Sequence, residues 1–298
     1  MVAPRREVAL LVNPQAGRGR GVAAGHSATN RLRDQGLRVQ VLQGRSAEES
    51  DHLARRSVQD GVDALVACGG DGTVNLALRA VGASGTPLGI IPAGSGDDLA
   101  RYLELPRHDP VAAADVVVRG SIRILDLARA GGRYFATVLA AGFDAVVNER
   151  AERMRWPRGS SRYGLATLAE LPALAPRSYT LELDGRTSSL SATLVAVGNG
   201  PSFGGGLRIA EGASLDDGLL DVVVLGPLSR ADLVRTYPRL YTGAHTSHPA
   251  YSHHRARTVT VASPGIVAHA DGERFGPLPL TIEAAPGALA VLAPGGAL

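Results

Sequence analysis

The segment from residue 68 to 75 places two glycines, an aspartate and a third glycine between two regular segments. The apolar run 62–67 before it is typical of a buried strand, and residues 76–81 after it begin a helix. Glycines let backbone N–H groups approach anionic oxygens closely, and a helix start adds partial positive charge. A carboxylate in the same turn can reach a metal ion. The segment therefore predicts a polyphosphate site.

The first 120 residues alternate short apolar segments with longer amphipathic ones. Ser46 followed by Glu49 forms a capping-box pattern at the start of one predicted helix. Strands that alternate with helices predict a doubly wound parallel sheet, which binds ligands at its carboxyl edge. The predicted strands are 7–12, 37–42, 62–67 and 87–91, and the predicted helices are 22–35, 46–60, 74–81, 97–103 and 110–118.

The pattern changes near Gly120, after which short β-branched runs are separated by glycine turns. This texture predicts an antiparallel β domain with helical interruptions at 161–174 and 229–242. The apolar run at the N-terminus ends at Asn-Pro and is predicted to be a first strand, not a secretory signal.

Composition narrows the chemistry. Hydrophobic residues make up 45% of the chain, and no apolar run approaches the ~20 residues that span a bilayer. A single cysteine excludes an internal disulfide, and we expect a cytoplasmic protein. The net charge of +3 gives little reason to expect nucleic-acid binding. Lysine is absent, so phosphate loops that need a lysine are excluded.

The loop after the first strand contains Asn13, Gly17 and Gly19. It can form a second wall of a nucleotide site, a dinucleotide-type glycine loop or a plain strand–helix turn. The dinucleotide interpretation requires an acidic residue at the end of the second strand, where this chain has Leu42-Gln43-Gly44. We therefore favour the interpretation that this loop forms one side of a nucleotide-binding site.

A third glycine loop, residues 92–101, again follows a strand and precedes a helix. Ser95 can donate a hydrogen bond to phosphate, and Asp98 can join Asp71 in a metal site held through water. Helix capping is the alternative role for Ser95 and Asp97. The presence of two such loops at one sheet edge favours the functional interpretation.

Asp271-Gly272-Glu273 follows the strand-like run 266–270. A carboxylate pair around a glycine is commonly just a hairpin turn. The alternative is catalytic, because phosphoryl transfer to an alcohol needs a carboxylate near the hydroxyl group.

These motifs together resemble the diacylglycerol kinase/sphingosine kinase family, specifically its soluble bacterial lipid-kinase branch. The resemblance covers nearly the whole chain, and the ordered set is more specific than the first motif, which NAD kinases share. The motifs are Gly69-Gly70-Asp71-Gly72-Thr73, residues 92–101, Gly142-Phe143-Asp144-Ala145, residues 216–221 and Asp271-Gly272-Glu273.

The resemblance implies an α/β plus all-β fold. A nucleotide-binding α/β domain of the NAD-kinase/phosphofructokinase type would comprise residues 1–125 and about 286–298. A β-sandwich lipid-substrate domain would comprise residues 126–285, and the active site would lie in the cleft between the domains.

The resemblance also implies roles for individual residues. Asp271 would be the general base toward the lipid hydroxyl, supported by Glu273. Catalytic Mg²⁺ would be held by Asp71, Asp98 and Asp126, and a structural Mg²⁺ by Asp217 with the carbonyls of Ser214 and Leu219. ATP would be bound by Asn13, Gly17, Gly69, Gly70, Asp71, Gly72, Thr73, Val74, Asn75, Gly94 and Ser95.

Two departures from the family pattern bear on nucleotide affinity. Leu76 stands where the family usually has glutamate, and Asp97 stands where it usually has asparagine. The extra charge of Asp97 should weaken ATP binding unless an arginine or a metal offsets it. Ser95 in place of threonine is a conservative change.

Three further features carry weaker predictions. Four histidines, at 245, 248, 253 and 254, fit a solvated loop better than a metal site. His269 is predicted to be a strand residue, and Cys68 a small buried one. The arginines at 150, 153, 155, 158 and 162, with Trp156 and Tyr163, form either a lipid-contacting surface or a solvated helix face.

The sequence thus predicts an ATP- and Mg²⁺-dependent lipid kinase, transiently associated with the membrane, with diacylglycerol as the leading acceptor. The alternatives are an NAD kinase and a catalytically weak lipid- or nucleotide-binding regulator. The sequence leaves open which lipid is the acceptor and whether ATP or GTP is the phosphate donor. It also leaves open the oligomeric state, for which a homodimer is one alternative.

Overall fold

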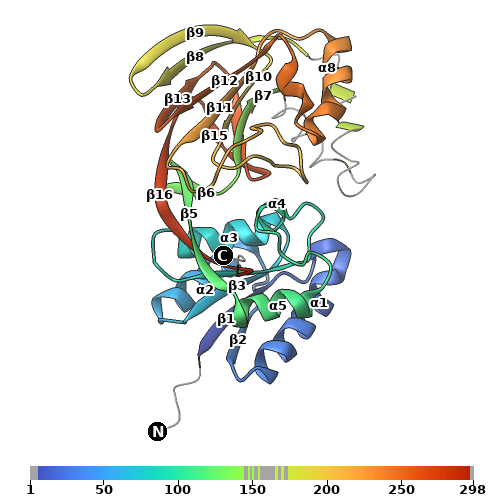
Figure 1. The fold of residues 1–298 in the computed structure, drawn as a ribbon, viewed down its shortest axis with the longest axis vertical. Helices are drawn as coiled ribbons and strands as arrows, with labels where there is room; N and C mark the ends of the chain where they lie inside the picture. Colours follow the sequence, from blue (N-terminus) through green and yellow to red (C-terminus); the bar gives the residue numbers. More distant parts are fainter. Residues whose placement is uncertain are drawn as a thin grey trace. The chain divides into compact units, whose positions relative to one another are not determined.

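The computed structural model describes residues 6–143, 147, 150, 154, 165–166, 169–170 and 174–295. The chain divides into two compact units. Unit 1 comprises Met1–Leu125 and Gly287–Leu298, and unit 2 comprises Asp126–Pro286. Two strands, β5 (Ser121–Ala130) and β16 (Leu280–Ala293), each begin in one unit and end in the other (Figure 1).

Unit 1 is built on a parallel sheet. Its strands are β1 (Glu7–Val12), β2 (Arg38–Leu42), β3 (Ala64–Gly69) and β4 (Leu88–Pro92), in the order β2-β1-β3-β4. The end of β16 adds a further parallel strand beside β4, with Val291 opposite Leu88. The predicted doubly wound sheet and the return of the C-terminal segment are both confirmed.

Helices cover both faces of this sheet. α1 (Ala16–Asp34) and α5 (Pro110–Arg119) contact each other on one face, and α2 (Ala47–Gln59) contacts α3 (Asp71–Val81) on the other. The short α4 (Asp98–Tyr102) follows β4. The core under α1 and α5 is aliphatic, as expected from the few aromatic residues. Ser46 caps α2, since its side chain accepts the N–H of Glu49 at 3.2 Å.

Unit 2 contains two antiparallel sheets. One has the order β12-β11-β10-β7-β14-β15. The other contains β16, β13, β8 and β9, with β5 paired to β16 and β6 paired to β5. The bounds are β6 Arg133–Phe135, β7 Val138–Gly142, β8 Arg177–Leu183, β9 Arg186–Ala192, β10 Leu194–Gly198, β11 Leu220–Leu225, β12 Tyr251–Ala256, β13 Thr258–Ala262, β14 Val267–Ala270 and β15 Glu273–Pro277.

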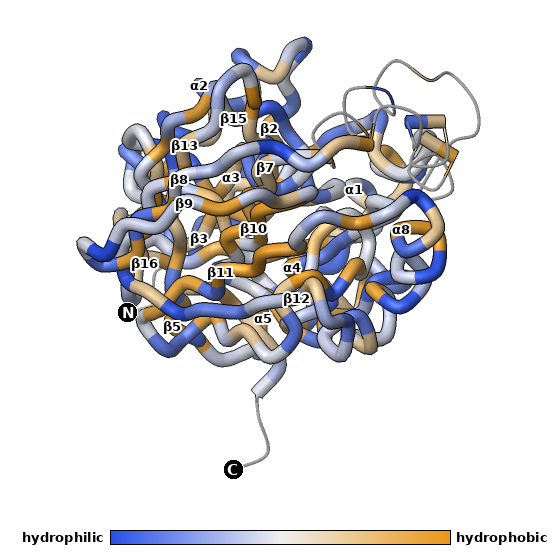
Figure 2. Tube along the Cα trace, turned by 90° about the horizontal axis from the view of Figure 1, so that it is seen from above, coloured by the Kyte–Doolittle hydropathy of each residue, from blue (hydrophilic) through white to orange (hydrophobic). Residues whose placement is uncertain are grey.

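The core of unit 2 draws buried side chains from both sheets, so the unit is a β-sandwich as predicted. Every residue of β10 and β11 is buried, and Figure 2 shows both strands as hydrophobic. Apart from Asp221 on β11, these strands are apolar throughout and do not alternate with polar residues, which indicates that both faces of this sheet are covered.

The predicted helix at 229–242 is divided. α8 (Arg230–Thr236) ends where the 3₁₀ helix Tyr237–Tyr241 begins, and Pro238 lies in the first turn of the latter. Proline lacks the N–H that an α-helix needs, which explains the change of helix type.

The histidine group does not converge on a metal. His245 is fully buried and bonds the carbonyl of Ile209 at 3.0 Å, and burial lowers the pKa of its ring. His253 and His254 lie on β12 and not in a loop. Among the described residues, no three His, Cys, Asp or Glu side chains form a metal-binding group.

Some predicted features lie outside the described residues. They are Asp144 and Ala145 of one motif, most of the predicted helix 161–174, and the aromatic residues Trp156 and Tyr163 with Arg153, Arg155, Arg158 and Arg162. No helix in the described part of the chain is long and apolar enough to cross a membrane.

Candidate active site

The strand order β2-β1-β3-β4 creates a switch point at the carboxyl edge of unit 1. The chain leaves β1 toward α1 on one face of the sheet and leaves β3 toward α3 on the other. Loops that diverge in this way open a crevice where α/β proteins bind ligands. The predicted nucleotide-binding residues follow β1, β3 or β4, apart from Gly69, which is the last residue of β3, so they lie at this edge.

A cavity of about 500 Å³ lies at the ends of β1 and β2 and beside the first turns of α3. Its volume falls in the range of about 300–1,000 Å³ that small-molecule sites occupy. Of the residues predicted to bind ATP, Asn13 and Thr73 line this cavity. The buried Oγ1 atom of Thr73 has no hydrogen-bond partner among the described residues. Leu76, the departure from the family pattern, also lines the cavity.

Sequence reasoning missed part of this cavity. The loop after β2 was judged only by its missing acidic residue, yet it contributes Gln43, Gly44, Arg45 and Ser46 to the lining. Arg45 is exposed and is paired with Glu49 at 3.1 Å. The position of the loop after β2, next to β1 in a sheet of this order, was the signal that could have identified it.

Three glycine loops approach each other so closely that side chains would not fit. A Cβ atom on Gly94 would lie 2.5 Å from the Cα atom of Gly70, and one on Gly17 would lie 2.0 Å from the carbonyl oxygen of Ala93. Gly17 also has a φ of 56°, which favours glycine. The segments after β1, β3 and β4 therefore meet. That they bind phosphate stays a prediction.

Asp71 joins two of these loops. Its Oδ2 accepts the N–H of Asp97 at 2.9 Å, and its Oδ1 accepts the N–H of Asp98 at 2.7 Å. The carboxylate therefore stabilises the start of α4, where N–H groups lack partners within the helix. Arg20, which the predicted set did not include, adds a second link by donating to the carbonyls of Gly17 and Gly94, each at 3.0 Å.

The remaining predicted residues of unit 1 lie around this junction. Gly69 is buried at the end of β3, and a Cβ atom there would meet Oγ1 of Thr73 at 2.1 Å. Ser95 and Gly72 are exposed, while Val74 and Asn75 are buried in α3. Cys68 is buried, and burial raises the pKa of its thiol to about 12, which agrees with a packing role.

Asp97 lies in a strained and acidic position. It has a φ of 52°, and its Oδ1 accepts the N–H of Gly94 at 3.1 Å. Burial of the carboxyl group, followed by the nearby charge of Asp71, raises its pKa from 3.8 to about 6. The hydrogen bond from Gly94, and then the charges of Arg107 and Arg20, lower the pKa but do not cancel this shift.

Replacing Asp97 with asparagine should stabilise the protein at neutral pH by about 1–3 kcal/mol. Because the pKa of Asp97 is raised on folding, its stabilising contribution is complete below pH 3.8 and is lost as pH rises through about 6. Asparagine keeps the acceptor for Gly94 and removes the charge. Urea unfolding of both proteins at about pH 4 and pH 7.5 measures the difference.

Asp184→Asn is the matched control for this prediction. Asp184 is also at positive φ and also accepts backbone N–H groups, but it is exposed. A gain from Asp97→Asn that is equal at the two pH values, or a similar gain from Asp184→Asn, would contradict the proposed charge effect.

The donor set in unit 1 fits a Mg²⁺ ion held largely through water. Each carboxylate oxygen of Asp71 accepts one N–H, which leaves a further lone pair on each oxygen. Asp98 is buried one residue after Asp97. The charge of Asp71, which adds to burial in raising the pKa of Asp97, is a repulsion that a cation would relieve. Mg²⁺ is commonly bound by one or two carboxylates, water and phosphate oxygens.

In unit 2, Asp271 and Gly272 form the two-residue turn of the β14–β15 hairpin, with φ values of 51° and 80°. The Asp271 carboxylate also binds the chain between β6 and β7. Its Oδ2 accepts the N–H of Ala136 at 2.9 Å, and its Oδ1 accepts the N–H and Oγ1–H of Thr137 at 2.9 and 2.6 Å. Asp271 thus belongs to a hairpin turn and also has a carboxylate held in place by hydrogen bonds.

Glu273 begins β15 and is partly buried, and His269 is buried within β14 as expected for a strand residue. The three hydrogen bonds hold the Asp271 carboxylate in one orientation. An oriented carboxylate of this kind can accept a proton from a hydroxyl group, while Glu273 adds negative charge nearby.

Asn199 organises the region around Asp271. It is fully buried, and its Nδ2 donates to the carbonyls of Asp126 at 3.0 Å and of Ala136 at 2.9 Å. Its own N–H donates to the carbonyl of Thr137 at 2.8 Å. In the sequence, Gly198-Asn199-Gly200 is one of the glycine turns between β-branched runs, and the partners of a buried amide cannot be read from such a local pattern.

Asp126 was predicted to share catalytic Mg²⁺ with Asp71 and Asp98, but it belongs to unit 2. There its Oδ2 accepts the N–H of Gly218 at 2.7 Å, and its N–H donates to the carbonyl of Leu215 at 2.6 Å. The observed bonds make Asp126 a support of the 214–219 turn. Its assignment to the catalytic metal stays a prediction.

The 214–219 turn does not fit the predicted Mg²⁺ ion. The Oδ1 of Asp217 accepts the N–H of Leu219 at 3.0 Å, and its Oδ2 is paired with the guanidinium group of Arg255. A positive charge thus already lies against the carboxylate that was predicted to bind metal with the carbonyls of Ser214 and Leu219.

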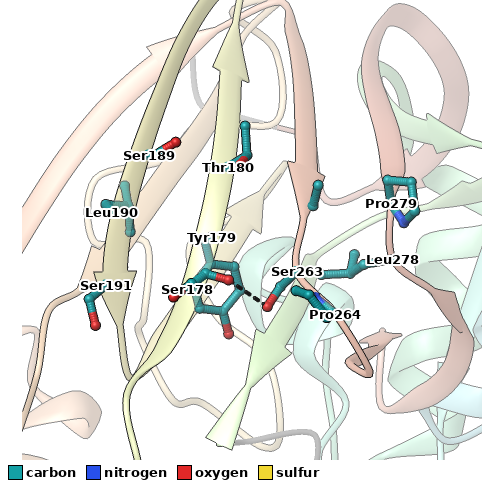
Figure 3. A pocket seen from close by; sticks show the side chains of 11 residues that line it. Ser178, Tyr179, Thr180, Ser189, Leu190, Ser191, Ser263, Pro264, Leu278 and Pro279 are labelled. Carbon is teal, nitrogen blue, oxygen red and sulfur yellow. Dashed lines mark hydrogen bonds between the residues drawn. The ribbon is translucent and has the colours of Figure 1, made fainter.

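Unit 2 also has an open groove of about 820 Å³ beside the β8–β9 hairpin. Figure 3 shows hydroxyl side chains along it, and Ser263 Oγ donates to the carbonyl of Ser178 at 2.8 Å. The groove is lined by no carboxylate, imidazole or cationic side chain among the described residues, so it offers no general base.

Two family models together match most of the chain. Residues 7–130 match the diacylglycerol kinase catalytic domain, and residues 137–293 match the YegS C-terminal NAD kinase beta sandwich-like domain. The chain is 45% identical over 294 residues to a diacylglycerol kinase of Mycobacterium tuberculosis, which covers 97% of this chain and 95% of that protein. The chain therefore belongs to the diacylglycerol kinase family of lipid kinases.

Solved structures agree on the fold. A Bacillus anthracis diacylglycerol kinase aligns with a TM-score of 0.75 at 20% identity and covers 97% of both chains. An NAD kinase from Archaeoglobus fulgidus in complex with ATP aligns with a TM-score of 0.52 at 14% identity, covering 96% of this chain and 93% of that one. The predicted NAD-kinase-like sheet followed by a β-sandwich is confirmed.

Proposed function

We propose that this lipid kinase transfers the γ-phosphoryl group of ATP to the hydroxyl group of diacylglycerol, with Mg²⁺. The observation that carries the proposal is the meeting of three glycine loops beside the 500 Å³ cavity of unit 1. Because lysine is absent from the chain, backbone N–H groups, arginine and a metal ion must hold the phosphates. The name of the Mycobacterium tuberculosis relative supports diacylglycerol as the acceptor.

In the proposed reaction, the oxygen of the lipid hydroxyl group attacks the γ-phosphorus, and Asp271 accepts the proton of that hydroxyl group. The bond between this phosphorus and the bridging oxygen breaks, and ADP leaves. Thr137 and the N–H of Ala136 keep the Asp271 carboxylate oriented toward the acceptor. Glu273 supports the charge of the base.

The loops of unit 1 bind and orient the nucleotide. Asp71 keeps the loops after β3 and β4 together, and Arg20 keeps the first loop beside them. When bound, Mg²⁺ supplies positive charge to the phosphate oxygens, and Asp71 with Asp98 would hold it. Diacylglycerol resides in membranes, so the proposal includes transient contact of a cytoplasmic protein with a membrane surface.

A second candidate is a regulator that binds nucleotide or lipid with little turnover. It is favoured by Leu76, which lines the cavity in place of the usual glutamate. It is also favoured by Asp97 at the glycine loops, where burial and then the charge of Asp71 raise the pKa of its carboxyl group. Both features would weaken nucleotide binding without touching Asp271.

The experiment that tests the function is transfer of labelled phosphate from ATP, with Mg²⁺, to a panel of lipids in mixed micelles. NAD serves as the soluble acceptor control. Label in diacylglycerol supports the proposal, and label in NAD refutes it. Binding of ATP with no label in any acceptor would favour the regulator.

A further inference from the structure

The turn at residues 214–219 is paired with a positively charged side chain of the protein, Arg255. Arg255 extends from β12, and its Nη2 pairs with Oδ2 of Asp217. The other oxygen of Asp217 accepts the N–H of Leu219 at 3.0 Å. Both oxygens of this carboxylate are therefore engaged by N–H donors, one of which bears a full positive charge.

The same guanidinium group faces a second carboxylate. Asp221 on β11 is 2% exposed, and its Oδ1 lies 3.6 Å from Nε of Arg255 and 2.6 Å from Nε2 of His253. The Oδ2 of Asp221 is buried with no hydrogen-bond partner among the described residues. A buried carboxylate is costly unless positive charge lies close to it. Arg255 thus serves two carboxylates at once.

We propose that the guanidinium group of Arg255 takes the place of the divalent cation at this turn, so that unit 2 holds the turn without a metal ion. Arginine stays protonated at every relevant pH, and its planar group can face two carboxylates. A Mg²⁺ ion at Asp217 would have to displace this charge and give up part of its tightly held water. Both requirements disfavour the metal.

The turn matters because hydrogen bonds connect it to Asp271. Gly218 donates to Asp126, and the carbonyl of Asp126 accepts a hydrogen bond from Asn199. Asn199 also donates to the carbonyl of Ala136, whose N–H donates to Asp271. With Arg255 as the cation, this connected set keeps its geometry whatever the Mg²⁺ concentration.

Thermal unfolding of the full chain without nucleotide tests this inference independently of activity. Each protein is unfolded without divalent ions and with about 10 mM MgCl₂ or CaCl₂, at constant ionic strength. The set comprises the wild type, Asp217→Asn, Arg255→Met, Arg255→Lys and the double variant Arg255→Met/Asp217→Asn. Any response from unit 1 is common to all five proteins and cancels in the comparison.

We expect the wild type, Asp217→Asn and Arg255→Lys to show the same response to divalent ions. Arg255→Met should have a lower unfolding midpoint that divalent ions raise by an extra ~2 °C or more. The double variant should lose this extra response, because the freed carboxylate is then absent.

Two outcomes would overturn the inference. A metal response of the wild type that Asp217→Asn reduces would place a divalent ion at Asp217 in the native protein. An Arg255→Met protein that folds but gains no extra response would show that the guanidinium group does not occupy a cation position. If Arg255→Met does not fold, the response of the unfolding midpoint to divalent ions in the wild type, Asp217→Asn and Arg255→Lys still shows whether a divalent ion binds at Asp217.

Discussion

Replacing Asp271 with asparagine should lower kcat for lipid phosphorylation by about 10²–10⁴-fold, with little change in the KM for ATP. Asparagine cannot accept the proton of the hydroxyl group. It also turns an NH₂ group toward one of the three donors that now bond Asp271, namely the N–H of Ala136 and the N–H and hydroxyl of Thr137. Steady-state kinetics with diacylglycerol in mixed micelles measures the effect.

The chain offers a close structural control for this variant. Asp184 and Gly185 form the turn of the β8–β9 hairpin, with φ values of 46° and 83°. Asp184 Oδ1 accepts two consecutive backbone N–H groups, of Arg257 at 3.0 Å and Thr258 at 2.9 Å. Asp184→Asn should lower the stability of the protein by a similar amount and leave kcat unchanged. An equal loss of kcat in the two variants would show that Asp271 has a purely structural role.

Two further variants separate orientation from proton transfer. Thr137→Val removes one hydrogen bond to Oδ1 of Asp271 and should lower kcat by about tenfold. Glu273→Gln should have a smaller effect than Asp271→Asn. A larger loss from Glu273→Gln would move the role of general base to Glu273.

Replacing Gly94 with alanine should weaken ATP binding by about 10²-fold and destabilise the protein by about 1–3 kcal/mol. The new Cβ atom would lie 2.4 Å from Oδ1 of Asp97 and 2.5 Å from the Cα atom of Gly70. The second of these atoms is backbone, so the loops after β3 and β4 must separate. Their separation would break the bonds that Asp71 makes to Asp97 and Asp98.

Equilibrium binding of ATP and urea unfolding together measure this prediction. Gly61→Ala is the control, because Gly61 has a φ of 86° and open space around its Cα atom. It should destabilise the protein through backbone strain and leave ATP binding unchanged. An ATP affinity within about twofold of the wild type for Gly94→Ala would refute the close contact of the loops as the binding cradle.

Much of unit 1 could be predicted because its signals are local. The run 7–12 forms the strand β1 with the predicted bounds, and the Ser46 cap and the helix that follows it lie where the pattern placed them. Each glycine loop follows a buried strand, and parallel strands bring such loops to one edge. Periodicity and capping act over a few residues, so the chain alone contains this information.

The bounds of individual elements were less exact. α1 begins at Ala16 and not near residue 22, because Gly17 and Gly19 in its first turn resemble a loop in the sequence. α3 likewise begins at Asp71, within the predicted glycine turn. Glycine has low helix propensity, and tertiary packing overrides that preference at both positions.

What the sequence determined by itself was the order of elements, the family motifs and the residue types at each loop. What only the tertiary structure decided was which of these residues meet. Asp71 bonds to N–H groups 26 and 27 residues away, and Asp271 bonds to residues 134 and 135 positions away. The pairing of Asp217 with Arg255, the central position of Asn199 and the raised pKa of Asp97 are of the same kind. Hydrogen-bond partners, burial and charge depend on neighbours in space, and a single sequence does not specify those neighbours until the chain has folded.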